Sequence, residues 1–174
     1  RAIPGMRALM RADFFSGFML GPSNCHPLSR GEIDLRSADP FASPVIRPNY
    51  LSDERDLDEL VQSARILRKI AAEQPLAGKI IREITPGPDT ETDEEMAADI
   101  RARSGSVFHA CGTCAMGPDP KKSVVGPRLR VHGVPGLRVV DASIFPLITS
   151  GNINAPSIMV GERGADFILE DMKG

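Results

Sequence analysis

The densest group of reactive side chains lies in FHACGTCAMG, residues 108–117, where His109 is followed by Cys111 and Cys114. A histidine titrates near neutral pH and can act as a general base. The C-x-x-C spacing of the two cysteines occurs in redox dithiols and in half of a zinc site. The segment therefore has the groups for proton transfer, thiol chemistry or metal binding. The non-functional alternative is a loop in which the histidine only forms structural hydrogen bonds.

The metal and dithiol interpretations lack the partners they need. A zinc site takes four ligands, and the remaining histidines and cysteines, Cys25, His26 and His132, stand at spacings that match no common zinc finger. No thioredoxin-like strand–helix pattern surrounds the C-x-x-C pair. We therefore predict no metal site. His132, in an HGVPG turn, is predicted to be structural; His26 is predicted to be a surface residue, with the lining of a substrate cavity as the alternative.

The elements that must position these groups begin with short strands. Mostly apolar or alternating runs predict strands at residues 13–20, 31–36 and 45–48. Two further short candidates, residues 128–131 and 137–140, flank the HGVPG turn. We expect the strands of the first third to form an antiparallel sheet that helices cover.

Helix signals follow the strands. Ser52 as cap, with two carboxylates in the first turn, predicts a helix over residues 53–72 whose apolar stripe faces a core. A short helix is expected over 76–81, and a Thr–Glu capping box predicts another over 92–104. A last helix should follow Asn154 as its cap, with Pro156 in the first turn. Its buried side is predicted to consist of Ile158, Met159, Ala165, Ile168 and Leu169.

Composition narrows the functional class. The 174 residues are 41% hydrophobic and 25% charged with a net charge of −2, which is typical of a globular protein and offers no basic field for nucleic acid. The longest apolar stretch, around residues 14–20, is too short to span a bilayer. Three cysteines argue against a disulfide framework and favour a reducing compartment, so a cytoplasmic location is predicted.

Three stretches in order resemble one family. They are SRGEIDLRSADPFASPVIRPNYLSDERDLDEL (29–60), FHACGTCAMG (108–117) and GLRVVDASIFPLITSGNINAPSIMVGERGADFI (136–168). Together they resemble the carboxy-terminal region of the glucose–methanol–choline (GMC) oxidoreductases, most closely the choline and bacterial alcohol dehydrogenase branch. The resemblance implies a flavin, FAD, held between an amino-terminal nucleotide-binding domain and a substrate domain. The Gly-rich turn of that nucleotide-binding domain does not occur in this sequence.

The resemblance therefore implies an α+β fragment whose amino-terminal FAD-binding domain is missing. Residues 1–105 correspond to a substrate domain with an antiparallel sheet and helices. Residues 106–174 carry the catalytic segment and a terminal helix that would return to the FAD domain. Without that domain we expect exposed apolar surface, which could drive homodimerisation. A tightly retained FAD is not expected in this chain alone.

By the same resemblance, the reaction is oxidation of the CH–OH group of a primary alcohol, choline-like or aliphatic, with hydride passing to flavin N5. His109 matches the family's catalytic base. Asn152 matches a second position, His or Asn, whose side chain can donate a hydrogen bond to the alcohol oxygen. A turn asparagine is the competing interpretation of Asn152, and Asn154 is a rival for its role.

The resemblance also assigns cofactor contacts. Asn154, Ala155 and Pro156 would place the positive end of the last helix beside the flavin edge that becomes negative on reduction. Asp141 and Ala142 would approach the cofactor through backbone groups, although a cap or turn role for Asp141 is nearly as good. The functional alternative from another class is a cofactor-free fragment that serves as a non-catalytic binding or interaction module.

Overall fold

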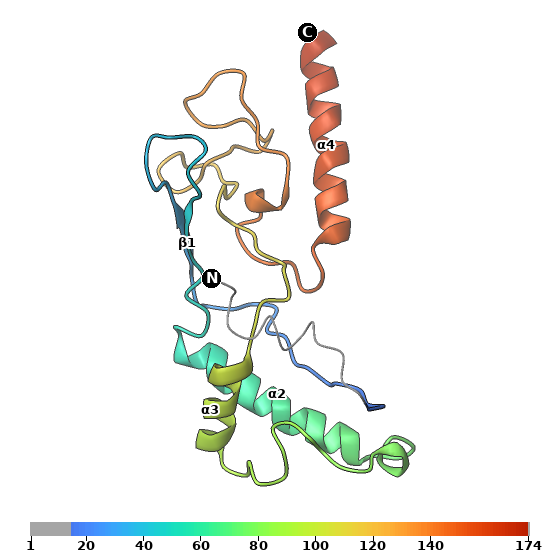
Figure 1. The fold of residues 1–174 in the computed structure, drawn as a ribbon. Helices are drawn as coiled ribbons and strands as arrows, with labels where there is room; N and C mark the ends of the chain where they lie inside the picture. The colour runs from blue at the N-terminus through green and yellow to red at the C-terminus, as the bar shows by residue number, and fades with distance from the viewer. Residues whose placement is uncertain (1–14, 174) are drawn as a thin grey trace. The chain divides into compact units, whose positions relative to one another are not determined.

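A computed structural model describes residues 15–173, and their elements confirm the α+β content (Figure 1). The chain divides into two compact units, which are described separately. The first comprises the described residues up to Gly31 together with Pro48–Val107, and the second comprises Glu32–Arg47 together with the residues from Phe108 onward. In chain order the elements are β1 (Glu32–Asp34), β2 (Val45–Arg47), α2 (Glu54–Ala72), η1 (Ala77–Lys79), α3 (Asp93–Arg103), η2 (Ala142–Ile144) and α4 (Asn154–Lys173).

Helix α2 begins one residue later than predicted, because its cap is Asp53 rather than Ser52. The Asp53 carboxylate accepts a hydrogen bond from the backbone N–H of Arg55 at 3.1 Å. Its hydrogen bonds with the Arg55 side chain and backbone also lower the pKa of Asp53 to about 2. Asp and Ser are about equally good caps, but only the carboxylate also complements the helix dipole with its charge. The helix predicted over 76–81 is only the short η1.

The capping box that predicted α3 is confirmed. The Thr92 hydroxyl accepts from the Glu95 N–H at 3.2 Å, and the Glu95 carboxylate accepts from the Thr92 N–H at 2.9 Å. Helices α2 and α3 pack together, and Leu57, Val61 and Met96 are their buried apolar residues. The apolar stripe of α2 therefore faces a core, as its spacing predicted.

A buried carboxylate ties the segment before the hairpin to α2. Asp56, only 2% exposed, accepts hydrogen bonds from the backbone N–H of Leu28 at 2.7 Å and of Ser29 at 2.8 Å, and from the Ser29 hydroxyl. Burial by itself raises the pKa of the Asp56 carboxyl, but these hydrogen bonds outweigh it and hold the pKa below its usual value. The Asp56 side chain thus joins the segment around Leu28 to α2.

The sheet is smaller than expected. Strands β1 and β2 form an antiparallel pair in which Ile33 lies opposite Ile46, and both of these side chains are exposed. No strand forms over residues 15–20 of the predicted strand 13–20, and residues 13–14 lie outside the described range. The sheet therefore consists of this pair alone among residues 15–173. Two three-residue strands offer too little surface to bury a face, because stable sheets need further strands.

The core of the second unit contains five buried residues: Val125, Leu129, Ile144, Phe145 and Val160. The two strands predicted beside the HGVPG turn are present only as isolated antiparallel bridges, one of which pairs Arg130 with Arg138. Leu129 has a φ of 62°, and Gly133 and Gly136 also have positive φ. Such left-handed residues bend the chain away from the extended form, so no continuous ladder develops.

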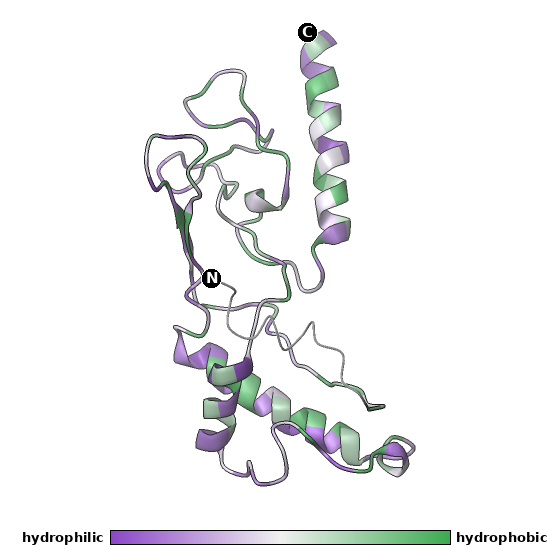
Figure 2. Ribbon diagram, viewed as in Figure 1, coloured by the Kyte–Doolittle hydropathy of each residue, from purple (hydrophilic) through white to green (hydrophobic). Residues whose placement is uncertain are grey.

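The predicted buried side of α4 is wrong. Ile158, Met159, Ile168 and Leu169 are between 42% and 60% exposed, and Ala165 is exposed as well. The face that packs on the core carries Val160, Gly164 and the half-buried Phe167. Apolar residues occur along the whole helix (Figure 2), so helical spacing alone could not select the packed face. No helix within residues 15–173 is long and apolar enough to cross a membrane.

At Gly164 the backbone of α4 lies close to the Val140 side chain. A Cβ atom there would lie well inside contact distance of Val140 Cγ1 and 3.2 Å from its Cγ2. Val140 is β-branched and cannot simply swing away. We therefore expect Gly164→Ala to lower the free energy of unfolding by about 1–2 kcal/mol, because overpacking costs about 1–3 kcal/mol and the gain in helix propensity returns up to ~1 kcal/mol.

Urea denaturation of the chain measures this change. Gly161→Ala is the matched control on the same helix, because a Cβ at Gly161 meets nothing within 4 Å. The control should raise stability by about 0.5–1 kcal/mol. If both variants were stabilised equally, the close packing of α4 on Val140 would be disproved.

Candidate active site

His109 and Asn152 meet, although they are 43 positions apart in the sequence. The Nε2 atom of His109 lies 3.0 Å from Oδ1 of Asn152. His109 is half-buried and Asn152 is exposed. Two polar groups at this separation can both reach one oxygen atom of a third molecule. The structure therefore brings together the two residues that the sequence predicted as a pair.

The segment that carries His109 has an unusual backbone. Phe108, directly before the histidine, has a φ of 62°, and Gly112 has a φ of 93°. Positive φ is uncommon for a residue with a side chain and is concentrated at functional positions. A Cβ at Gly112 would approach the Phe145 carbonyl oxygen to 3.4 Å, so glycine suits both the conformation and the space.

Backbone hydrogen bonds fix this segment to the turn at η2. The Ser143 carbonyl oxygen accepts from the N–H of Gly112 at 3.1 Å and of Cys114 at 3.0 Å, and the Ile144 carbonyl accepts from Met116 at 2.8 Å. Ile144 is in turn part of the buried core. The segment that carries His109 is therefore held by main-chain hydrogen bonds to a turn that contains a core residue, rather than by side-chain contacts.

Asp141 has a local role at the start of η2. Its Oδ1 accepts from the Ser143 N–H at 2.7 Å, so the carboxylate caps the turn. This contact agrees with the alternative role of Asp141 as a cap or turn residue. Ala142, the next residue, is half-buried and packs against the core cluster. Both residues lie in the turn that supports the His109 segment.

The amino end of α4 begins at Asn154 itself, which corrects the prediction of Asn154 as the cap. The Ile153 carbonyl accepts the first helical hydrogen bond, from the Ser157 N–H at 2.9 Å, so Ile153 occupies the cap position. Asn154 and Ala155 are exposed, and Pro156 lies in the first turn as predicted. The end of the helix that carries partial positive charge is thus accessible and starts two residues after Asn152.

Thr149 was not singled out by the sequence. Its Oγ1 atom is, within residues 15–173, the one buried side-chain oxygen or nitrogen without a hydrogen-bond partner. It lies in the loop between η2 and α4, three residues before Asn152. A buried hydroxyl without a partner costs free energy. Nothing in the residue pattern signals this, because the burial depends on how the loop folds.

The other reactive residues do not assemble into a site. Across the described range, no three His, Cys, Asp or Glu side chains are grouped as metal ligands would be. Cys111 and Cys114 are half-buried, and Cys111 packs against the core. His132 Nε2 lies 3.1 Å from the Gly117 carbonyl oxygen and 3.2 Å from the Ser123 hydroxyl, which is a structural contact, and His26 is exposed.

Comparison with known proteins decides the family. The carboxy-terminal family model of the GMC oxidoreductases matches residues 27–161. The chain belongs to the GMC oxidoreductase family. It is 46% identical over 153 residues to an alcohol dehydrogenase [acceptor] of Pseudomonas putida, covering 88% of this chain and 28% of that protein. It is 50% identical over 142 residues to an oxygen-dependent choline dehydrogenase of Sinorhizobium medicae, covering 81% of this chain and 26% of that protein.

The GMC fold is also recognisable in three dimensions. A solved FAD-dependent oxidoreductase from Chaetomium thermophilum superimposes with a TM-score of 0.79 at 33% identity, covering 86% of this chain and 26% of that one. The GMC relatives are FAD-dependent oxidoreductases, and they include choline and alcohol dehydrogenases. This chain spans about a quarter of the length of the relatives that it matches.

Proposed function

We propose that this chain is the carboxy-terminal part of an FAD-dependent GMC oxidoreductase that oxidises the CH–OH group of a primary alcohol, choline-like or aliphatic. The observation that carries the proposal is the His109–Asn152 pair, with 3.0 Å between Nε2 and Oδ1. The names of the relatives, alcohol dehydrogenase and choline dehydrogenase, agree with an alcohol as the substrate class.

Each member of the pair has a distinct task. His109 accepts the hydroxyl proton of the alcohol, because a neutral imidazole nitrogen is a base suited to neutral pH. Asn152 donates an amide N–H to the same oxygen as negative charge develops on it, and the amide does not titrate. Asn152 is exposed and the His109 ring is half-buried, so the described residues do not fully enclose either side chain.

A bound FAD would supply the acceptor for the hydride that leaves the alcohol carbon. Several features of this chain suit a flavin beside the pair. The accessible first turn of α4, at Asn154 and Ala155, offers N–H groups and partial positive charge, which favour the negative reduced form by about 0.3–1 kcal/mol. Thr149 has an unpartnered hydroxyl in the adjoining loop, and the turn at Asp141 and Ala142 offers backbone groups.

The missing part of the protein would cover the surfaces that this chain leaves open. The exposed apolar side chains of α4 and of the β1–β2 hairpin, such as Leu169 and Ile33, have no packing partner among residues 15–173 that would remove them from solvent. We place the substrate domain at residues 1–105 and the flavin-contacting part at residues 106–174. The preceding FAD-binding domain would bury the outer face of α4; homodimerisation is the competing way to bury it.

Anaerobic mixing of the longer, flavin-loaded protein with a panel of primary alcohols tests the function. Bleaching of the oxidised flavin absorbance by at least one alcohol, at a rate that saturates with its concentration, is the expected result. Secondary alcohols and carboxylic acids serve as controls and should not reduce the flavin. If the loaded protein is not reduced by any primary alcohol, the proposed reaction is wrong.

The non-catalytic alternative has a separate test. This chain is mixed with FAD and passed through gel filtration. Retained flavin absorbance would exclude a cofactor-free module. Loss of the flavin from this chain, combined with reduction of the longer protein by alcohol, would assign FAD binding chiefly to the preceding residues.

A further inference from the structure

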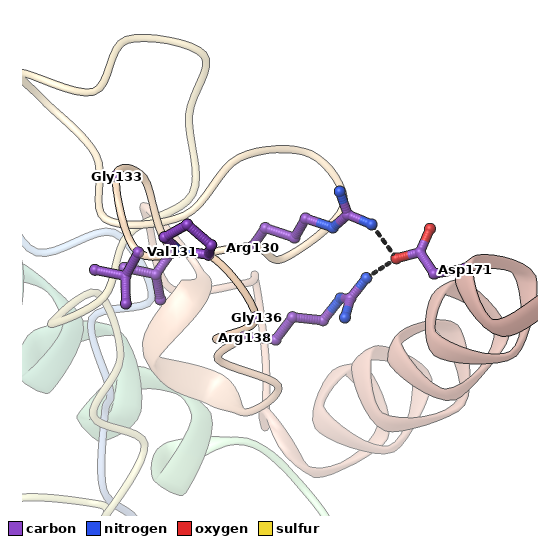
Figure 3. Close-up of a pocket in the computed structure, with 8 residues that line it drawn as sticks. Arg130, Val131, Gly133, Gly136, Arg138 and Asp171 are labelled. Carbon is purple, nitrogen blue, oxygen red and sulfur yellow. Dashed lines mark hydrogen bonds and ion pairs between the residues drawn. The ribbon is translucent and has the colours of Figure 1, made fainter. Parts of the chain in front are cut away.

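Three arginines of one segment converge on the last turns of α4. Arg128, Arg130 and Arg138 all donate hydrogen bonds to the carboxylate of Asp171, and Figure 3 shows the side chains of Arg130 and Arg138 directed at the same oxygen. The Arg128 Nη2 to Asp171 Oδ1 distance is 2.9 Å, and the Nη1 atom of Arg128 lies 2.9 Å from Glu170. The Arg138 side chain is 16% exposed and that of Asp171 26%, so the hub of the cluster is largely withdrawn from solvent.

A second set of contacts lies one turn earlier on the helix. Two guanidinium groups, those of Arg128 and Arg163, lie over the Phe167 ring, each 4.6 Å from its centroid. The Nη2 atom of Arg128 also donates to the Phe167 carbonyl oxygen at 3.3 Å. The end of α4 is therefore held to the 128–138 segment by ion pairs, stacking and one main-chain contact.

The same segment leads to the support of His109. Past Arg138 the chain reaches Val140, which packs on Gly164, and then the η2 turn that accepts the hydrogen bonds of the His109 segment. At the opposite end of α4 the helix begins two residues after Asn152. A hydrogen-bonded helix of 20 residues is a rod about 30 Å long, so rotation or sliding at one end moves the other.

We propose that Asp171 is a positioning residue for the His109–Asn152 pair. By binding Arg128, Arg130 and Arg138 it fixes the rotation and axial position of α4, and the helix passes that constraint to Asn152. Few buried residues hold α4 otherwise, chiefly Val160 and Gly164. The contacts that support this positioning role all lie within one compact unit. The expected effect of Asp171 on the reaction rate rests, in addition, on the proposed function.

The test compares Asp171→Asn with Glu162→Gln. Glu162 lies on the same helix, is exposed and has no ion-pair partner among the described residues, so its variant removes a charge without touching the cluster. The first readout is the NMR signal of the His109 ring in this chain, labelled at its histidines. Asp171→Asn should shift the His109 ring signals, Asp171→Glu should restore most of the parent spectrum, and Glu162→Gln should leave the spectrum unchanged. His26, in the other unit, should keep its signals in all variants.

Arg130→Gln keeps the test informative if Asp171→Asn folds poorly. This variant removes one of the three arginine partners of Asp171 and should give a smaller shift of the His109 signals.

In the longer, flavin-loaded protein, Asp171→Asn should lower kcat several-fold with little change in KM. Unchanged His109 signals, with faster amide exchange confined to residues 165–173, would overturn the proposal by giving Asp171 a local role only. A shifted His109 with an unchanged rate of flavin reduction would support the positioning and count against the catalytic role of the pair.

Discussion

Replacing His109 by alanine in the longer, flavin-loaded protein is expected to slow flavin reduction by an alcohol about 10²–10⁴-fold, the usual contribution of a positioned general base. Without the imidazole, the hydroxyl proton must leave to water while hydride departs from carbon. Rapid mixing under anaerobic conditions, in a single turnover, measures the step without interference from the electron acceptor. The bound flavin itself should be retained, because His109 is proposed to act on the substrate.

Two measurements distinguish the loss of the catalytic base from general damage to the protein. Added imidazole should restore part of the lost rate in His109→Ala, since a small free base can enter the space left by the ring. His26→Ala, which alters an exposed histidine of the other unit, should reduce at the parent rate. A His109→Ala protein that is reduced as fast as the parent would remove His109 from the mechanism.

The second large effect is expected at Asn152. Asn152→Ala should slow flavin reduction about 10²–10³-fold, the range seen when one donor to a developing oxyanion is removed. Asn152→Asp should be at least as slow, because a carboxylate repels the negative charge on the alcohol oxygen. Asn152→His, which retains a ring N–H donor, should keep more activity than either. The measurement is again the single-turnover rate of flavin reduction.

Asn154→Ala is the control that decides between the two asparagines. Asn154 is the first residue of α4, and the side chain that meets His109 is that of Asn152, so the Asn154 variant should change the rate much less than Asn152→Ala does. The reverse order of effects would transfer the donor role to Asn154. A double variant of His109 and Asn152 should be less impaired than the product of the single effects, because residues that act as a unit are not additive.

Much of the local structure could be predicted from sequence because it depends on near neighbours. The capping box at Thr92 and Glu95, the strands around Ile33 and Ile46, and Pro156 in the first turn of α4 all rest on contacts a few residues long. The candidate pair could be predicted for a different reason. His109 and Asn152 each lie in a segment with a family pattern, and the resemblance supplied the long-range relation that spacing could not.

Where prediction from sequence failed, two local arrangements were about equally favourable, and tertiary packing selected one of them. Ser52 and Asp53 are both good caps, and the carboxylate prevailed. Helix α4 carries apolar residues on more than one face, and its packed face was decided by the close approach that only Gly164 permits beside Val140. The burial of the Thr149 hydroxyl and the convergence of three arginines on Asp171 likewise depend on distant segments.

By itself, then, the sequence predicted helices α2 and α3, the two short strands and the candidate pair of His109 and Asn152. Only the tertiary structure decided that His109 Nε2 lies 3.0 Å from Asn152, that Asp141 caps its own turn, and that the outer face of α4 remains exposed. The physical reason is that hydrogen bonds between near neighbours are encoded locally. The choice of a packed face and the meeting of distant side chains depend on volume and charge contributed by the whole unit.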